Sequence, residues 1–429
     1  MRKRLSTRIM SLLLVFAMLI SLFPAAFAVE TDGADSGNLD ASASVVDASD
    51  QDDSKDGSAS GLDHLNRAPV QKAAQNAAGT IYYVANSANG GSDLAANDGS
   101  ESKPFLTIKK AIETATAAGA ESLTINLLSD INSTLELVFD STMPITIQSA
   151  GNTLHKVQFS GTTPIGSDSG FVKATNNANV TFKNMTLAGS TGTYDGRVLY
   201  AADGATVYLE NVTVTSGRAN NVLNDQGGAG IYAAEGGTVS VSGSSIIRGN
   251  TTIGNGGGIY VEDGGAVNLS DSVTVTENTA KSGGGICAET QTTTTGGLTM
   301  IGSVSVQSNV ASVEGSGMYV AKDARASVSG NVTIYGNLKN KLQNNVYLAE
   351  DATLDISGAT TSAKIGISAD PEEAYRLVSL PKNYSISPTK NGDEKGWCDD
   401  CGEWDIRYMS YKGVPGLYLY YKTLDMTFE

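Results

Sequence analysis

Carboxylates that lie close in the sequence to a base, or to each other, are the residues best suited to chemistry in this chain. Three pairs have this property: Asp195 with Arg197, Asp225 with Arg218, and Glu262 with Asp263. A carboxylate beside a base can act as a general acid or base, and neighbouring carboxylates can bind Ca²⁺. Solvated loop charge explains these pairs at least as well. We therefore keep the first two pairs as weak catalytic candidates and Ca²⁺ as the only cofactor that the sequence suggests.

Tyrosine recurs at one place in a repeated pattern, and its ring suits contacts with sugar rings and with proteins. The recurring positions are Tyr200, Tyr232, Tyr260, Tyr319 and Tyr347, and Cys287 takes the place between Tyr260 and Tyr319. Identical aromatic residues on neighbouring strands also stabilise a sheet by packing on each other. The five tyrosines are therefore candidate ligand-binding residues, with strand stacking alone as the simpler explanation.

Cys398 and Cys401 form a C-x-x-C motif in a chain that holds three cysteines. Such a motif can be a redox pair, half of a zinc site or a local disulfide. Zinc would need two further ligands, and only Cys287 and two scattered histidines are left to supply them. We favour a local disulfide between Cys398 and Cys401, and we predict no metal site.

The tyrosines belong to a repeat, which places them on equivalent strands. The residue just before each recurring position is apolar: Leu199, Ile231, Ile259, Ile286, Met318 and Val346. Successive members of this series are 32, 28, 27, 32 and 28 residues apart. A second series, aliphatic-x-x-Asn, keeps the same phase and ends at Asn250, Asn278, Asn309 and Asn337. Self-similarity with such a period is typical of solenoid proteins.

Each repeat contains three short segments of alternating polarity, separated by turns rich in glycine or asparagine. One such unit cannot bury its own faces, but stacked coils can, because each strand pairs in parallel with its equivalents in the neighbouring coils. Alternation then places the apolar neighbours inside and the recurring tyrosines outside. We expect the asparagines in a turn, where they bond backbone groups and the next coil. The predicted fold is all-β, a right-handed parallel β-helix over residues 122–369.

A strand and one short helix are expected in residues 80–121, ahead of the repeat. Apolar residues from Ile108 to Ala115 have helical spacing, Thr107 is a suitable N-cap, and Gly119 fits the C′ position. Residues 91–112 resemble the opening of many secreted right-handed parallel β-helix proteins of the pectate-lyase-like superfold. In those proteins the helix plugs the N-terminal end of the solenoid, so the resemblance implies a capping helix here.

The two markers of the repeat, Gly-Gly-[Ala/Gly]-x and aliphatic-x-x-Asn, resemble the repeat of the polymorphic outer membrane proteins. They are also similar to repeats in adhesin-like surface proteins of gut Gram-positive bacteria. The resemblance covers about residues 189–367, with Ile or Val where the outer membrane family usually has Phe. It implies an adhesin-like surface protein. Other β-helix proteins are polysaccharide lyases and hydrolases that cluster Asp with Arg or Lys on the outer face of one sheet, and this again singles out Asp195, Arg197, Arg218 and Asp225.

The N-terminal residues predict export. Four basic residues within Met1–Arg8 precede the apolar run Ile9–Phe23, and Ala26 and Ala28 supply the small residues that a signal peptidase reads. We expect a signal peptide over residues 1–28. Residues 29–63 hold ten acidic residues, one lysine and no aromatic residue, so residues 29–79 are interpreted as an acidic disordered linker.

Residues 370–429 lack the repeat and are richer in aromatic residues, which predicts a small C-terminal β module that caps the solenoid. A lectin-like module is the less favoured interpretation of these exposed aromatic residues. The chain has no second long apolar run, so we expect no transmembrane helix in the mature protein.

The charge balance narrows the class of partner. Acidic residues outnumber basic ones 45 to 29, for a net charge of −16, which argues against nucleic acid, because nucleic-acid affinity depends on Lys and Arg. We expect a secreted or cell-surface, adhesin-like protein that binds a glycan or a host or cell-surface protein rather than catalysing a reaction. The alternatives are a polysaccharide lyase or glycoside hydrolase on a β-helix scaffold, and a structural stalk for a further C-terminal domain.

Overall fold

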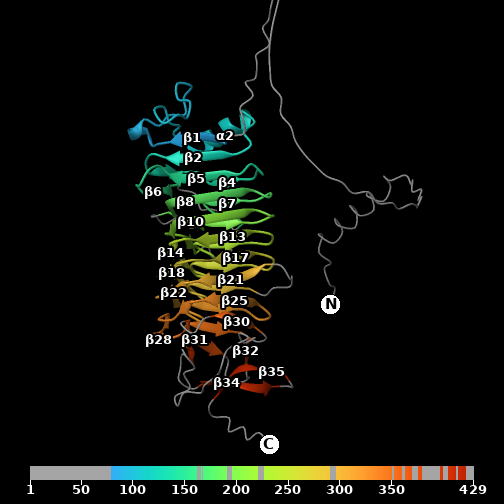
Figure 1. Ribbon diagram of the computed structural model, residues 1–429. Helices are drawn as coiled ribbons and strands as arrows, with labels where there is room; N and C mark the ends of the chain where they lie inside the picture. Colours follow the sequence, from blue (N-terminus) through green and yellow to red (C-terminus); the bar gives the residue numbers. More distant parts are fainter. Residues whose placement is uncertain are drawn as a thin grey trace, which may run out of the picture. The chain divides into compact units, whose positions relative to one another are not determined.

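The chain folds into a stack of parallel β-coils with one α-helix among the described residues, which confirms the predicted fold class (Figure 1). The computed structural model describes residues 79–421, except for 162–165, 167, 191–195, 221–226, 290–295, 350–351, 360–362, 370–374, 379–396, 400–403 and 412–413. The strands of the coils form three columns, and strands in a column pair in parallel. The solenoid makes about seven turns.

The first column carries the recurring tyrosines at the middle of its three-residue strands. Its members, in order of pairing, are β4 (Leu137–Phe139), β7 (Val172–Ala174), β9 (Leu199–Ala201), β12 (Ile231–Ala233), β16 (Ile259–Val261), β20 (Ile286–Ala288), β24 (Met318–Val320) and β29 (Val346–Leu348). The strands pair without a register shift, so equivalent side chains lie one coil apart, at about 4.8 Å.

The second column is formed by longer strands. They are β1 (Thr80–Val84), β2 (Leu123–Leu127), β5 (Ile145–Ser149), the first halves of β8 (Asn179–Ala188) and β10 (Thr206–Thr215), β13 (Thr238–Ser242), β17 (Ala266–Leu269), β21 (Gly297–Gly302), β25 (Arg325–Gly330) and β30 (Thr353–Ala359).

The third column closes each coil. It runs through β3 (Ile131–Ser133), β6 (His155–Phe159), the second halves of β8 and β10, β14 (Ile246–Arg248), β18 (Thr274–Thr276), β22 (Ser305–Gln307), β26 (Thr333–Ile334), β31 (Lys364–Ala369) and β33 (Trp397–Asp399).

The inward residues of all three columns form one continuous core, as the alternation predicted. Ile259 and Val261 on β16 are fully buried, while Tyr260 between them belongs to a separate cluster on the outer face. The same pattern holds for the second column, where Val267 and Leu269 are buried and Asn268 is exposed. Burial of apolar side chains along every coil supplies the main stabilisation of the stack.

The predicted asparagine series forms a buried ladder at one corner of the solenoid. The side-chain Nδ2 of Asn250 donates to Oδ1 of Asn278 at 2.9 Å, Asn278 to Asn309 at 3.0 Å, Asn309 to Asn337 at 2.9 Å, and Asn337 to Asn345 at 3.0 Å. Each Oδ1 also accepts the backbone N–H of the preceding asparagine. The ladder thus satisfies buried polar groups from coil to coil, as expected for these residues.

Short strands that the sequence analysis missed form a separate sheet: β11 (Arg218–Ala219), β15 (Thr251–Thr252), β19 (Thr279–Ala280), β23 (Val310–Ala311), β27 (Leu338–Lys339) and β28 (Leu342–Gln343). A strand of this sheet directly follows the asparagine in four coils (β15, β19, β23 and β27), β11 aligns with them one coil earlier, and β28 pairs antiparallel with β27. Two residues are too few to show an alternating pattern, so nothing in the sequence distinguishes these strands from turns.

Glycines on the approach to the first column have a steric role. Gly256 and Gly283 have φ values of +66° and +64°, and a Cβ at either position would lie 2.4 Å from a backbone carbonyl oxygen, that of Ile259 or of Ile286. Only glycine adopts this left-handed conformation without strain in so small a space. The abundance of glycine therefore reflects corners of this kind.

The predicted helix is α2 (Ile108–Ala117), which packs beside β1 and β2 at the first coil, after the 3-10 turn η1 (Ser87–Asn89). Its N-cap is Thr107, whose hydroxyl accepts the N–H of Lys110 at 3.1 Å, and Gly119 after its end has a φ of +69°, both as predicted. At the other end, β32 (Tyr375–Val378), β34 (Trp404–Tyr411) and β35 (Val414–Tyr421) form an antiparallel sheet.

We expect Asn278→Ala to destabilise the solenoid by on the order of 3 kcal/mol, because it leaves several buried polar groups of the ladder without partners. Urea unfolding followed by circular dichroism measures this change. Asn268→Ala is the matched control, since Asn268 is exposed on the same coil, and its effect should stay within about 0.5 kcal/mol. Equal losses from the two substitutions would contradict a structural role for the ladder.

Candidate functional site

The recurring tyrosines lie on the outer side of the first column, which we call the tyrosine face: Tyr200, Tyr232, Tyr260, Tyr319 and Tyr347. Their outward direction is as predicted, but their exposure is uneven. Tyr232 is only 2% exposed and Cys287 is fully buried, whereas the other four tyrosines are half-buried. Part of the tyrosine face is therefore covered rather than open to solvent.

The rings stack in two blocks. In the first block the ring centroids of Tyr200 and Tyr232 are 5.6 Å apart and those of Tyr232 and Tyr260 are 4.8 Å apart. In the second block Tyr319 and Tyr347 are 5.7 Å apart with their planes within 4°. Cys287 separates the two blocks. Stacking accounts for part of the recurrence of tyrosine, because such pairs stabilise a sheet.

Two glutamates connect the first block to the following coils. The hydroxyl of Tyr232 donates to the carboxylate of Glu262, and that of Tyr260 donates to Glu289. In each case the carboxylate comes from the next coil, two residues after the recurring position. Glu262 also accepts the backbone N–H of Glu235. The geometry thus fixes the hydroxyl end of each ring as well as its plane.

Arg197 is part of this face, although it was proposed as a catalytic residue. Its side chain is only 4% exposed, and its Nε donates to the carbonyl oxygen of Gly227 at 2.9 Å. Its guanidinium lies 4.3 Å from the ring centroid of Tyr232, a cation–π contact. Arg197 therefore joins neighbouring coils and covers the ring of Tyr232.

Burial and neighbouring charges shift the pKa of these groups. Burial, helped by nearby carboxylates, raises the pKa of Tyr200 to about 12 and raises the pKa of Tyr232 and Tyr260 further. Burial also raises the pKa of Glu262 and lowers that of Arg197, although Tyr232, Tyr200 and the carboxylates around Arg197 favour its charged form. The tyrosine hydroxyls are accordingly protonated donors at neutral pH.

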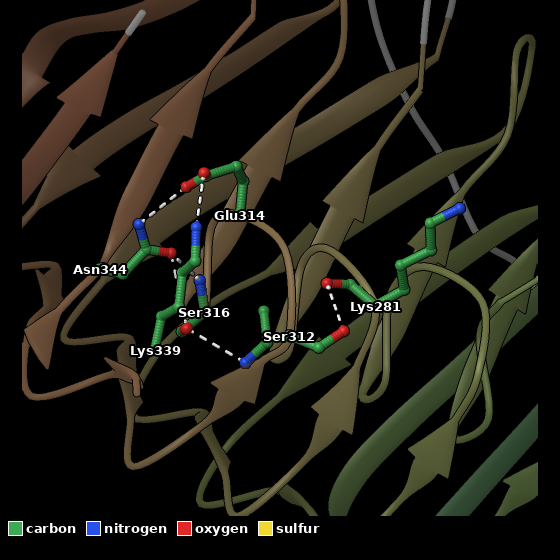
Figure 2. A network of polar contacts seen from close by, with 7 residues as sticks. Lys281, Ser312, Glu314, Ser316, Lys339 and Asn344 are labelled. Atoms are coloured by element: carbon green, nitrogen blue, oxygen red, sulfur yellow. Dashed lines mark hydrogen bonds and ion pairs between the residues drawn. The ribbon is translucent and has the colours of Figure 1, made fainter. Parts of the chain in front are cut away.

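A polar network lies beside the second block, at the turn between β23 and β24 (Figure 2). Lys339 Nζ is 2.7 Å from Glu314 Oε1, and Asn344 Nδ2 donates to Glu314 Oε2 at 3.0 Å. The Oδ1 of Asn344 in turn accepts the backbone N–H of Ser316 at 2.9 Å. This network fixes the turn that leads into Tyr319.

The remaining catalytic candidates are not brought together by the described residues. Asp195 and Asp225 lie outside them. Arg218 is exposed on β11, and its backbone N–H donates to Gly196 at 3.0 Å. Because both carboxylates lie outside the described residues, neither predicted pair of carboxylate and base is tested, and a catalytic role for these residues stays a prediction.

Of the three cysteines, two lie among the described residues. Cys401 lies outside the described residues and Cys398 is on β33, so the predicted disulfide is untested. Cys287 is a free, buried cysteine. Among the described residues no three or more His, Cys, Asp or Glu side chains gather as a metal site would require, and Ca²⁺ binding stays a prediction.

Glu289 is the functional candidate that the sequence analysis missed. The sequence contains a signal for it, since Tyr260-Val261-Glu262 and Cys287-Ala288-Glu289 share the spacing that places a carboxylate beside the ring of the preceding coil. That contact joins residues about 30 positions apart, so the pattern is recognised only after the coils are aligned.

Within the described part of the chain, no helix is long and apolar enough to cross a membrane. Comparisons of the sequence with known protein families and with curated proteins, and of the structure with solved structures, give no match.

We expect the contribution of the Tyr232 hydroxyl to stability to disappear in alkaline solution. The folded pKa of Tyr232 is raised above the ordinary value of about 10, so the unfolded chain loses this proton first and becomes relatively more stable. Relative to Tyr232→Phe, the wild type should lose about 1.4 kcal/mol for each pH unit above about 10. Urea midpoints of both proteins between about pH 9 and pH 11.5 measure the difference. A difference that is constant over this range would contradict the assignment.

Proposed function

We propose that this chain is a secreted or cell-surface, adhesin-like protein that binds a glycan or protein ligand without catalysis through its tyrosine face. The observation that carries the proposal is the set of stacked tyrosine rings on the outer side of the first column, two of which, Tyr232 and Tyr260, donate their hydroxyls to carboxylates of the next coil. The resemblance of the repeat markers to adhesin-like surface proteins, and the predicted signal peptide, support the same function.

The physical reason is preorganisation. A ligand that packs on a tyrosine already fixed by stacking and by a hydrogen bond causes little loss of side-chain entropy on binding. Tyrosine combines an apolar ring with a polar hydroxyl, which suits sugar rings as well as protein surfaces. Tyr319 and Tyr347 are available for contact, because they stack on each other and, like Tyr200 and Tyr260, are half-buried. Tyr232 has a structural role in this proposal, since it is covered by Arg197.

We expect the double variant Tyr319→Ala, Tyr347→Ala to weaken binding by at least about tenfold, since aromatic anchors dominate interfaces of this kind. Glycan arrays, mucin and immobilised cell-surface proteins supply the ligands for the measurement. Tyr208→Ala is the matched control, because Tyr208 is 43% exposed on β10 in the second column. Unchanged binding by the double variant, or an equal loss in Tyr208→Ala, would remove the tyrosine face from the proposal.

The non-catalytic part of the proposal has its own test. We expect a broad panel of neutral and acidic polysaccharides to remain intact after incubation with the protein, both with Ca²⁺ and with a chelator. Product formation is followed as new reducing ends and as the ultraviolet absorbance of unsaturated uronates. The appearance of either product would favour the lyase or hydrolase alternative over a binding protein.

A further inference from the structure

The first column of strands begins at β4, near the same end of the stack as α2 (Figure 1), and no described strand pairs with the edge of β4 that faces away from β7. The N–H of Leu137 donates to the carbonyl oxygen of Phe171 at 2.7 Å, and the carbonyl oxygen of Phe139 accepts from Thr175 at 2.9 Å. Because the backbone groups of successive residues in a strand point in opposite directions, the N–H and C=O of Val138 point to the open edge. Such an edge is a template for pairing with another strand.

The chain covers the corresponding edge of the second column. The N–H of Tyr83 on β1 donates to Gly99 at 2.8 Å, and its C=O accepts the N–H of Phe105 at 2.9 Å, so a loop pairs with β1 where a preceding coil would lie. In the third column β3 starts without a described strand before it, but its outward residue, Asn132, is polar and exposed. Val138 on β4 is apolar and 47% exposed. The edge of β4 is thus both open and apolar.

A pocket of about 240 Å³ lies at this edge, between α2 and β4. Lys109, Ile112 and Glu113 line it from α2, and residues 135–138 line it from the other side. Its wall includes Leu135, whose side chain is 65% exposed. Sites for drug-sized ligands have volumes of about 300–1,000 Å³, so this smaller pocket suits one or two side chains of a peptide.

The rim of the pocket is acidic. Lys109 Nζ is 3.7 Å from Glu113 Oε1, so this pair has no net charge. Glu136 adds a carboxylate, whose Oε2 accepts the hydroxyl hydrogen of Ser169 at 2.8 Å, and Lys109 is the one basic residue among those that line the pocket. The negative charge of Glu136 therefore favours a basic residue in whatever segment occupies the pocket.

The chain's own strands show which sequence fits this edge. Most later strands of the first column have the pattern aliphatic-x-aliphatic, as in Ile259–Val261 and Val346–Leu348, with the outer two residues buried in the core. A strand added to β4 in the same register would place its middle residue beside Val138 and its two aliphatic residues beside Leu137 and Phe139. Those two residues would then meet the apolar lining of the pocket.

We propose that the open edge of β4 and its pocket bind an extended segment of a protein partner by parallel strand addition. The segment has an aliphatic residue on either side of the residue beside Val138, and a basic residue that faces Glu136. In binding of this kind the backbone hydrogen bonds supply affinity, and pockets for alternate side chains supply specificity. The inference goes beyond the proposed function, because it needs none of the rings of the tyrosine face.

The test is binding of fluorescent peptides to the full chain, measured by anisotropy. The peptides have the sequence Lys-Gly-X-Tyr-X-Gly-Lys, in which both X are Ile, Leu or Val, and we expect at least one of them to bind. N-methylation of the second X removes the N–H that would donate to the C=O of Val138, and should weaken binding by about fivefold, as expected for one hydrogen bond. N-methylation of the Tyr, whose N–H would point away from β4, is the matched control and should change affinity by less than about twofold.

Two variants of the chain locate the site. Leu135→Asp places a charge on the apolar wall of the pocket and should weaken peptide binding by at least about tenfold. Leu154→Asp is the matched control, because Leu154 is 66% exposed and does not line the pocket, and we expect wild-type affinity. Both leucines are largely exposed, so the urea midpoints of the two variants should equal that of the wild type.

Several outcomes would overturn the inference. They are no binding by any peptide of the set, equal weakening by the two N-methylated peptides, and equal weakening by Leu135→Asp and Leu154→Asp. Sedimentation of the full chain tests a second copy as the occupant. A dimer that Leu135→Asp dissociates and Leu154→Asp does not would assign the edge of β4 to self-association, and would overturn the assignment to a protein partner.

Discussion

Parallel pairing in strict register is the constraint on which the rest of this structure depends. Every coil places its strands against the equivalents in the next coil, and a shift by one residue would move the whole inward set of side chains to the solvent side. Two features maintain the register at the corners. The asparagine ladder links the coils from Asn250 to Asn337 through buried amides, and glycines such as Gly256 and Gly283 take backbone conformations that a side chain would strain.

The same register explains why equivalent positions matter chemically. Side chains at one position of the repeat are brought within about 5 Å of each other, so a residue is favoured there if it interacts well with a copy of itself. Asparagine does, because each amide both donates and accepts. Tyrosine does, because its rings stack. Burial has an electrostatic cost for a carboxylate on this face, since it raises the pKa of Glu262, with help from the charges of Glu235 and Asp168. The hydroxyl of Tyr232 offsets part of it.

Much of the fold follows from the sequence because the same arrangement of strands and turns recurs in successive coils. The phase of Ile259 with its equivalents predicted the strands and the core, the asparagine series predicted the ladder, and Thr107 predicted the start of the helix. The candidate site was less predictable. The burial of Tyr232 depends on Arg197, a residue without an equivalent in other coils, and the contact of Tyr260 with Glu289 joins neighbouring coils. The two-residue strands, such as β15, have no periodic signal at all.

The departures from the repeat are therefore the most informative positions for function. At Cys287 the column has a small side chain that is fully buried, although the coils on both sides have a tyrosine at the same register position. This change of residue divides the rings into two stacked blocks, Tyr200 to Tyr260 and Tyr319 to Tyr347. Arg197, which has no equivalent in the other coils, lies on the ring of Tyr232 within the first block. Two residues that depart from the repeat, Cys287 and Arg197, thus decide which rings stack on each other and which ring is covered.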